Sequence, residues 1–252
     1  MKNKLLEIAE QFGTPTYVYD LSRLRDQITK LREFVGIYPK TKFLYAIKAN
    51  FNQHVVREII NNGLGIDAVS PEEVMYSNSL GANIEDIIFT GNNMSDEDMT
   101  KCHELGVLLN IDSLSRLEKF GIKHPNSNIC VRFNPNIGDG NHNHNITGGP
   151  DSKFGISYSQ VNEVLETVKK HNLKLKGIHQ HIGSGWLNLE YPLKSLEVIL
   201  NIASQIPDLE FIDLGGGLGI PYNNEDELNI ITLGEEINEK FTRFSKEYGK
   251  EL

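Results

Sequence analysis

The sequence has few of the features that mark several large classes of protein. Its 252 residues include two cysteines, Cys102 and Cys130, which form no close pair. Neither a disulfide framework nor a zinc knuckle is therefore predicted, and a reducing compartment is expected. No apolar run approaches the length of a membrane span. The N-terminus leads into an amphipathic stretch with Glu7 and Glu10 rather than an apolar signal-peptide core. We therefore expect a cytoplasmic protein with no membrane partner.

Positive charge is also scarce. The formal net charge is -9 at pH 7, from 25 Lys and Arg against 34 Asp and Glu. A surface for nucleic acid or an anionic membrane needs a basic face, so neither partner is predicted. Hydrophobic residues make up 39% of the chain, which is ordinary for a globular protein, and the length suits one large domain. Any bound anion must therefore be held by backbone amides or by a few placed cations.

The sequence does contain a regular alternation of short apolar runs and helical stretches. The predicted strands span residues 43–47, 65–69, 87–90, 107–111, 129–134, 176–181 and 210–214. Helical stretches lie between them, and several open on serine-led start signals at Ser70, Ser95 and Ser113. Strands that alternate with helices in this way predict an α/β protein built of βαβ units around a parallel sheet.

Seven strands leave two architectures open. A closed parallel barrel needs eight strands, and the last predicted helix, residues 233–248, brings the chain to Leu252. The sheet is then either open and doubly wound or a (β/α)₈ barrel that is incomplete at the C-terminus, and the chemistry below favours the barrel. Before it, residues 4–12 predict a helix, 16–19 a strand and 22–34 a second helix. We divide the chain into an N-terminal segment, 1–30, and a barrel, 31–252.

The C-terminal ends of barrel strands are where reactive residues collect. Lys48 follows the first predicted strand, Asp67 lies in the second and Arg132 in the fifth. A lysine at the edge of an apolar site can lose its proton and attack an aldehyde to form a Schiff base. The alternative is that Lys48 extends from the strand end into water.

A glycine turn, Gly215-Gly216-Gly217, follows the last predicted strand. Backbone N–H groups in such a turn can close on an anion without interference from Cβ atoms, and the loops after strands seven and eight are the usual phosphate site of this barrel. The turn lacks the context of a dinucleotide-binding fingerprint. The alternative is that it is only a tight turn.

Two histidines, His179 and His181, lie on one face of the sixth predicted strand because side chains alternate with period two. They suit a metal pair, extended by His142 and His144, or one imidazole that stacks on a flat cofactor ring while Ser184 binds its phosphate. A satisfied core histidine is the third possibility, and we favour it for His179. The polar loop 136–151 predicts either a lid over a substrate or plain disorder.

Taken together, these segments resemble the barrel domain of the fold-type III pyridoxal-phosphate enzymes, most closely the diaminopimelate decarboxylases. The matching segments are 45–50 (YAIKAN), 65–70 (GIDAVS), 131–135 (VRFNP), 147–156 (TGGPDSKFGI), 179–185 (HQHIGSG) and the glycine turn. Their order and spacing are specific, and the SKFGI segment favours these enzymes over ornithine decarboxylase and alanine racemase. The resemblance runs from about Phe12 to the end of the chain.

The resemblance implies a role for each matching residue. Lys48 would hold pyridoxal 5'-phosphate as a Schiff base, and His181 would stack on the pyridine ring. Asp67 and Arg132 would shape the floor of the site. Ser184 and the amides of Gly215, Gly216 and Gly217 would hold the phosphate, with Gly217 the principal position. The implied reaction is decarboxylation of meso-2,6-diaminopimelate to L-lysine and CO₂ by a cytoplasmic homodimer, with no resident metal.

The chain also departs from the family pattern. The Glu-Pro-Gly-Arg motif of these enzymes does not appear before Leu252, nor does the β-domain that supplies a cysteine acid and a tyrosine across the dimer interface. We therefore expect the strand at 16–19 to lack its sheet and the 252-residue chain to be inactive or very weakly active by itself. Two alternatives stay open: a pyridoxal-phosphate carrier that does not decarboxylate, and a metal-dependent hydrolase that uses His179 and His181.

Overall fold

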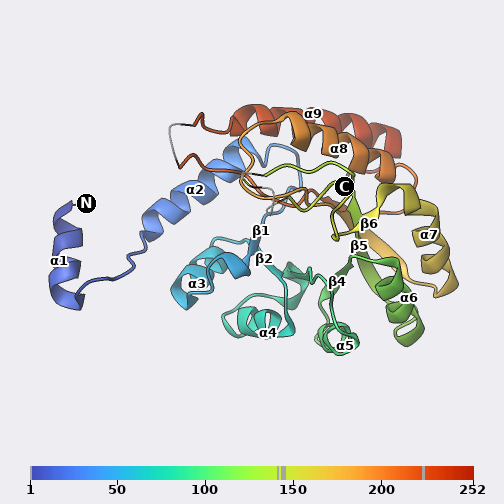
Figure 1. Ribbon diagram of the computed structural model, residues 1–252, viewed down its shortest axis with the longest axis horizontal. Coiled ribbons are helices and arrows are strands. Elements are labelled where there is room, and N and C mark those ends of the chain that lie inside the picture. The colour runs from blue at the N-terminus through green and yellow to red at the C-terminus, as the bar shows by residue number, and fades with distance from the viewer. Residues whose placement is uncertain (1, 141, 143–145, 223–224) are drawn as a thin grey trace.

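The computed structural model describes residues 2–140, 142, 146–222 and 225–252. His144, one of the histidines of the metal hypothesis, lies outside the described residues. The described strands form one parallel sheet that curves through the middle of the molecule, with helices arranged around its outer side (Figure 1).

The sheet follows the chain in order. Its path is β1 (Leu44–Ala46), β2 (Gly65–Ala68), β3 (Ile87–Phe89), β4 (Leu108–Ile111), β5 (Asn128–Asn134), β7 (Lys174–His179) and β8 (Phe211–Asp213). The two-residue strand β6 (Ile156–Ser157) pairs only with β5. Each strand on the path lies beside its predecessor, as in a (β/α) barrel, whereas a doubly wound sheet reverses its strand order. The prediction of an incomplete barrel is therefore confirmed, and the doubly wound alternative is wrong.

The helices alternate with the strands as predicted. They are α1 (Lys2–Phe12), α2 (Leu21–Phe34), α3 (Gln53–Asn61), α4 (Pro71–Ser79), α5 (Asp96–Glu104), α6 (Leu114–Lys123), α7 (Val161–Lys170), α8 (Glu190–Ala203) and α9 (Ile230–Tyr248). The predicted start signals precede three of them. Ser70 caps α4 by accepting from the Glu73 N–H, and Ser95 forms a capping box with Asp98 at the start of α5. Ser113 precedes α6, but its side chain makes no capping hydrogen bond.

The two faces of the sheet differ sharply in polarity. Period-two alternation and the parallel register place Ile66, Phe89, Leu109, Ile129 and Ile178 on the outer face, where all are at least 99% buried against the helices. The other face carries charged and polar groups. The hydrophobic core therefore lies between the sheet and its helices, and the inner face of the sheet is left for chemistry.

The first and last parts of the barrel pack against each other through α2 and α9. A Cβ added to Gly234 of α9 would lie 1.6 Å from the carbonyl oxygen of Phe34, so only glycine allows this approach. Beside it, the Tyr38 ring lies 5.2 Å from that of Phe241, and its hydroxyl is 2.6 Å from that of Ser245. These contacts fix the segment that leads into β1.

The prediction of a strand at residues 16–19 is wrong. The segment between α1 and α2 forms no strand, Tyr17 is 92% exposed, and Figure 1 shows α1 standing apart from the sheet. A strand exists only where its backbone groups pair with a neighbour, and no strand lies beside this segment in the part of the chain that the structure describes. None of the helices described here is long and apolar enough to cross a membrane.

Candidate active site

The inner face of the sheet gathers polar side chains from distant parts of the chain. The register places Arg132 of β5 opposite His179 of β7, and His179 opposite Asp213 of β8. Stepwise pairing from β2 to β5 places Asp67 and Asn110 on the same face. Asn110, Arg132 and His179 are each at least 94% buried. Buried polar groups are costly unless they are paired or used, so this face is a candidate site on physical grounds alone.

Lys48 lies where the sequence predicted, directly after β1, in the short 3₁₀ helix η1 (Ile47–Ala49). Its side chain is exposed, whereas the neighbouring Ile47 is fully buried and anchors the turn. The positive charge of Lys48 contributes to the pKa shifts of Asp67, His179 and His181. The charge of Lys48 therefore lies near enough to these three groups of the inner face to affect their protonation.

Asp67 is a poorly satisfied carboxylate at the end of β2. Burial raises its pKa above the ordinary value, while a hydrogen bond from Thr90 and the charges of Lys48 and Arg132 lower it in part. One of its oxygens, Oδ1, is buried without a hydrogen-bond partner among the described residues. A buried acceptor of this kind is costly in isolation, which marks it as a position for a ligand or a water.

Arg132 sits at the centre of the candidate site. Burial lowers the pKa of its guanidinium to about 10, against the opposing effects of Asp112, Asp67 and Asp213. The guanidinium lies 4.8 Å from the ring centroid of Phe154, and it donates to the His181 carbonyl oxygen at 3.3 Å. The predicted SKFGI segment therefore contributes the ring against which this arginine is packed.

His181 follows β7, and both its backbone carbonyl and its imidazole ring are hydrogen-bonded. Its carbonyl oxygen accepts from Arg132 and from the Thr147 hydroxyl, the latter at 3.0 Å, and its Nδ1 accepts from the Gly216 N–H at 3.3 Å. Burial, with Arg132 and Lys48 nearby, lowers the pKa of the imidazole to about 4. The ring is therefore neutral at pH 7, and because Nδ1 is an acceptor, its proton lies on Nε2.

The glycine turn packs against the segment that follows β7. A Cβ on Gly215 would lie 2.4 Å from the Gln180 carbonyl oxygen, and one on Gly217 only 1.9 Å from that of Gly183. Both residues also have positive φ, +71° and +100°. The N–H of Gly215 donates to Asp213 and that of Gly216 to His181, so two of the three amides have partners within the protein. Ser184 lies exposed in the adjoining segment.

The loop 136–151 is ordered where it meets this segment. The N–H groups of Asp139, Thr147 and Gly148 all donate to the Ile182 carbonyl oxygen, and Ile146 bridges to Gly183. At the base of the loop, the Asn134 side-chain amide donates to the Gly149 carbonyl oxygen and accepts from the Gly149 N–H. The parts of the loop that the structure describes are thus hydrogen-bonded to the segment that directly follows His181.

Three residues that the fold brings to this site, Asp213, Asp112 and Asn110, have no role predicted from the sequence. Asp213 is half-buried and interacts electrostatically with Arg132, and its pKa is raised to about 6 by partial burial, against a hydrogen bond from the Gly215 N–H. Asp112 directly follows β4 and accepts from Asn92 at 2.5 Å, and Oδ1 of the buried Asn110 has no hydrogen-bond partner among the residues that the structure describes. Asp213 ends β8, Asp112 directly follows β4 and Asn110 lies one residue before the end of β4, and these positions were the signal available in the sequence.

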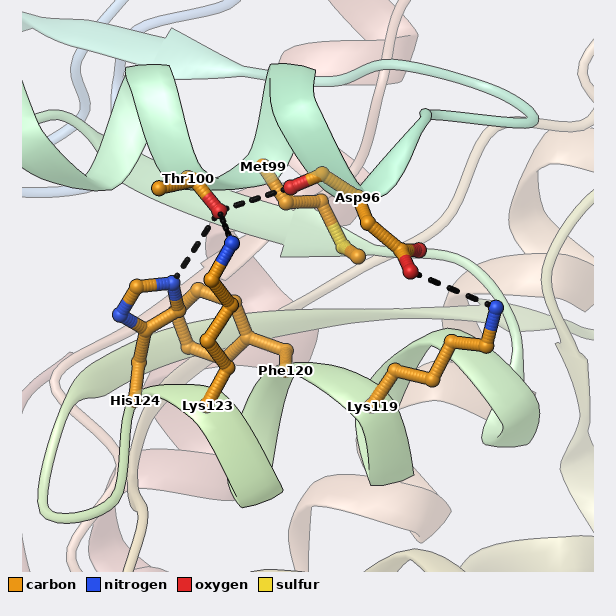
Figure 2. A pocket seen from close by; sticks show the side chains of 7 residues that line it. All are labelled: Asp96, Met99, Thr100, Lys119, Phe120, Lys123 and His124. Atoms are coloured by element: carbon orange, nitrogen blue, oxygen red, sulfur yellow. Dashed lines mark hydrogen bonds and ion pairs between the residues drawn. The ribbon is translucent and has the colours of Figure 1, made fainter.

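The metal hypothesis gains no ligand set from the structure. Across the described residues, no group of three or more His, Cys, Asp or Glu side chains could hold a metal ion. His179 is buried, with its pKa well below the ordinary range because of burial and of Arg132. A cavity of about 80 Å³ between α5 and α6 is lined by Lys119, Lys123, His124 and Thr100 among others (Figure 2), and it contains none of the predicted site residues.

Several known proteins have sequences similar to this chain. Residues 23–251 match the family described as pyridoxal-dependent decarboxylase, pyridoxal binding domain. The diaminopimelate decarboxylase of Methanothermobacter thermautotrophicus is 39% identical over 252 residues, which cover 97% of this chain and 59% of that protein. That of Escherichia coli K12 is 32% identical over 229 residues, with 88% and 53% covered. The chain thus spans little more than half the length of these relatives.

Solved structures of such enzymes have the same fold. A crystal structure of diaminopimelate decarboxylase superposes with a TM-score of 0.89 at 29% identity, covering 99% of this chain and 59% of that one. The enzyme from Helicobacter pylori, complexed with L-lysine, gives 0.87 at 28% identity, with 92% and 61% covered. Because the family match spans most of the chain and the strand-end residues converge as that fold requires, this protein belongs to the pyridoxal-dependent decarboxylase family and contains its pyridoxal binding domain.

Proposed function

We propose that this chain binds pyridoxal 5'-phosphate at the inner face of its sheet and that the whole protein decarboxylates meso-2,6-diaminopimelate to L-lysine and CO₂. The observation that carries the proposal is the convergence of Lys48, Asp67, Arg132 and His181. They come from four separate segments, yet the charges of Lys48 and Arg132 shift the pKa values of both Asp67 and His181. Such mutual perturbation at strand ends is typical of an active site.

The residues present fit this cofactor. Lys48 is an amine at the edge of the site, suited to covalent attachment at the cofactor's aldehyde carbon. The neutral His181 ring suits the face of a pyridine ring better than a charged imidazolium. The turn at Gly217, a position too crowded for any side chain, suits the phosphate. Asp67 and Arg132 form the floor beneath Lys48, where Asp67 Oδ1 still lacks a hydrogen bond.

Bound pyridoxal phosphate supplies an electron sink that stabilises the carbanion left when an amino acid loses its carboxylate. The protein's part is to orient the cofactor and the substrate and to exclude water. Arg132, packed on Phe154, fixes the backbone of His181, and Thr147 fixes the same carbonyl from the loop 136–151. Ser184 and the Gly215–Gly217 turn lie at the phosphate end of the proposed site.

The substrate assignment rests on the relatives. Curated proteins that match over nearly the whole chain are diaminopimelate decarboxylases, and one similar solved structure holds L-lysine, the expected product. Lysine/ornithine decarboxylase of Vibrio vulnificus has the same fold at a lower identity of 25%. On the family resemblance we extend the proposal to a cytoplasmic homodimer.

The first test is cofactor attachment. Lys48→Ala should abolish the visible absorbance of bound pyridoxal phosphate and its fixation by borohydride. Lys42→Ala is a matched control because that side chain is 82% exposed and precedes the same strand. Equal cofactor fixation in Lys48→Ala and in the unaltered protein would refute the role of Lys48.

The second test is turnover. CO₂ release from meso-diaminopimelate, ornithine and lysine should be compared, both with this chain and with a form extended to the length of the relatives. We expect diaminopimelate to be preferred by the extended form. A preference for ornithine or lysine would overturn the substrate assignment while leaving the cofactor assignment intact.

A further inference from the structure

Trp186 is the chain's single tryptophan, and it is only 5% exposed. It follows β7 and packs with Ile182, Leu228 and Leu233 in a small apolar cluster separate from the main core. A fully desolvated indole N–H must find an acceptor, so the hydrogen bond that Trp186 makes has structural consequences.

The acceptor is the glycine turn. The indole Nε1 donates to the Gly216 carbonyl oxygen at 3.2 Å. The backbone N–H of Trp186 donates to the next carbonyl oxygen, that of Gly217, at 3.1 Å, and Gly185 donates to the same oxygen at 2.8 Å. The Gly219 N–H returns a bond to the Trp186 carbonyl oxygen at 2.8 Å. Side chain and backbone of one residue therefore fix two successive peptide units of the turn.

Because the peptide bond is planar, these contacts also fix the directions of the neighbouring N–H groups. In a trans peptide the C=O and the N–H of one unit point opposite ways. Because the Gly216 carbonyl points at the indole, the Gly217 N–H points away from it. The Gly217 carbonyl points at the Trp186 backbone, so the Leu218 N–H points away likewise. Neither N–H donates to an acceptor within the described part of the chain.

The indole also enforces the close approach of the turn. A Cβ on Gly217 would lie 2.7 Å from the indole Nε1, so any side chain at this position would collide with the ring. Side-chain packing thus holds the ring, and the indole N–H holds the Gly216 carbonyl oxygen. The Trp186 backbone N–H holds that of Gly217, and the two carbonyls orient two N–H groups that have no acceptor among the described residues. Adjacent N–H groups that point the same way form an anion-binding concavity.

We propose that Trp186 is a positioning residue that aims the Gly217 and Leu218 N–H groups at the cofactor phosphate. The inference rests on the proposed function, because it assumes that the phosphate binds at this turn. It adds a residue that none of the matching sequence segments includes. Trp186 touches neither the cofactor ring nor the substrate in this account, and its effect is confined to the phosphate end.

The test compares two ligands that differ only in the phosphate. Trp186→Phe keeps an aromatic ring in the apolar cluster and removes the N–H donor. We expect its affinity for pyridoxal phosphate to fall about fivefold to tenfold, the effect of one hydrogen bond, while its affinity for pyridoxal changes less than about twofold. Leu187→Val is the control, because Leu187 packs against the same cluster and donates no side-chain hydrogen bond to the turn. It should leave both affinities unchanged.

Equal weakening of both ligands by Trp186→Phe would overturn the proposal, since it would show general damage to the site. Unchanged affinity for both would overturn it as well. A thermal melt of each variant without ligand identifies a folding defect.

A second measurement needs no variant. The single tryptophan gives a single indole N–H signal in a nitrogen-15 spectrum. Inorganic phosphate and pyridoxal phosphate should both shift this signal, and pyridoxal should not. A signal that neither phosphate ligand moves contradicts the role of Trp186. If pyridoxal phosphate does not attach to Lys48 but inorganic phosphate moves the signal, the proposed function fails and the anion-positioning role of Trp186 stands.

Discussion

At the scale of single residues, the site depends on positions where only one side chain, or none, fits. Gly217 has a φ of +100°, and a Cβ there would lie 1.9 Å from the Gly183 carbonyl oxygen. Its neighbour Gly216 differs in both respects. It has no positive φ, and a Cβ there would meet nothing within 4 Å. Of these two adjacent glycines, only Gly217 is therefore required on steric grounds.

Gly217→Ala should displace the turn and lower the affinity for pyridoxal phosphate at least tenfold, because the added Cβ forces the turn away from Gly183. It should also destabilise the fold by about 1–3 kcal/mol through backbone strain. Gly216→Ala is the matched control and should change each quantity little. Equilibrium dialysis and urea unfolding measure the two effects. Equal behaviour of the two variants would contradict this account.

At the scale of secondary-structure elements, the helices that surround the sheet begin by different local means. Ser95 and Ser113 both occupy N-cap positions with extended backbone. Only Ser95 uses its hydroxyl, accepting from the Asp98 N–H at 3.0 Å while the Asp98 carboxylate accepts from the Ser95 N–H at 3.1 Å. The start of α6 is instead fixed by burial of Leu117 and Phe120 in the core.

Ser95→Ala should therefore cost about 1 kcal/mol of the free energy of unfolding, the usual effect of losing an N-cap side chain. Ser113→Ala should cost less than about 0.5 kcal/mol, because no capping hydrogen bond is lost. Urea denaturation of the two variants measures the difference. A larger loss in Ser113→Ala than in Ser95→Ala would show that the cap at α5 does not contribute as described.

At the scale of the whole molecule, the inner face of the sheet couples stability to pH. The pKa of His181 is lowered to about 4 from an ordinary 6.5, and that of His179 is lowered also. Between pH 6.5 and 4 the unfolded chain therefore binds more protons at these residues, and folding stability falls as the pH falls. Asp213 acts with the opposite sign. Its pKa is raised to about 6, so below that pH the folded state binds its proton more readily.

Two variants should consequently move the acid limb of the stability curve in opposite directions. His181→Asn should flatten the loss between pH 6.5 and 4, and Asp213→Asn should steepen it between pH 6 and 4. Each proton accounts for at most about 1.4 kcal/mol per pH unit. Urea unfolding at a series of pH values measures both slopes. Parallel curves for the unaltered protein and both variants would show that these groups do not control the acid limb.

Much of the fold follows from local sequence patterns. The seven apolar runs and the serine caps at Ser70 and Ser95 predict the elements of the barrel because each depends on residues near in sequence. The predicted strand at 16–19 shows where that reasoning fails. Its apolar and aromatic residues favour a strand, but pairing depends on a neighbour that local pattern does not supply. The strand β6 has only two residues, too few to show a period.

The sequence by itself determined that Lys48, Asp67, Arg132, His181 and the glycine turn lie at or near the C-terminal ends of strands, and the parallel order of the strands brings those ends together. Only the tertiary structure decided how they are held. The neutral His181, the Thr147 and Arg132 bonds to its carbonyl oxygen, and the Trp186 indole on Gly216 depend on burial and on contacts between residues as far as 49 positions apart. Desolvation and peptide orientation are properties of the packed molecule, and no sequence period encodes them.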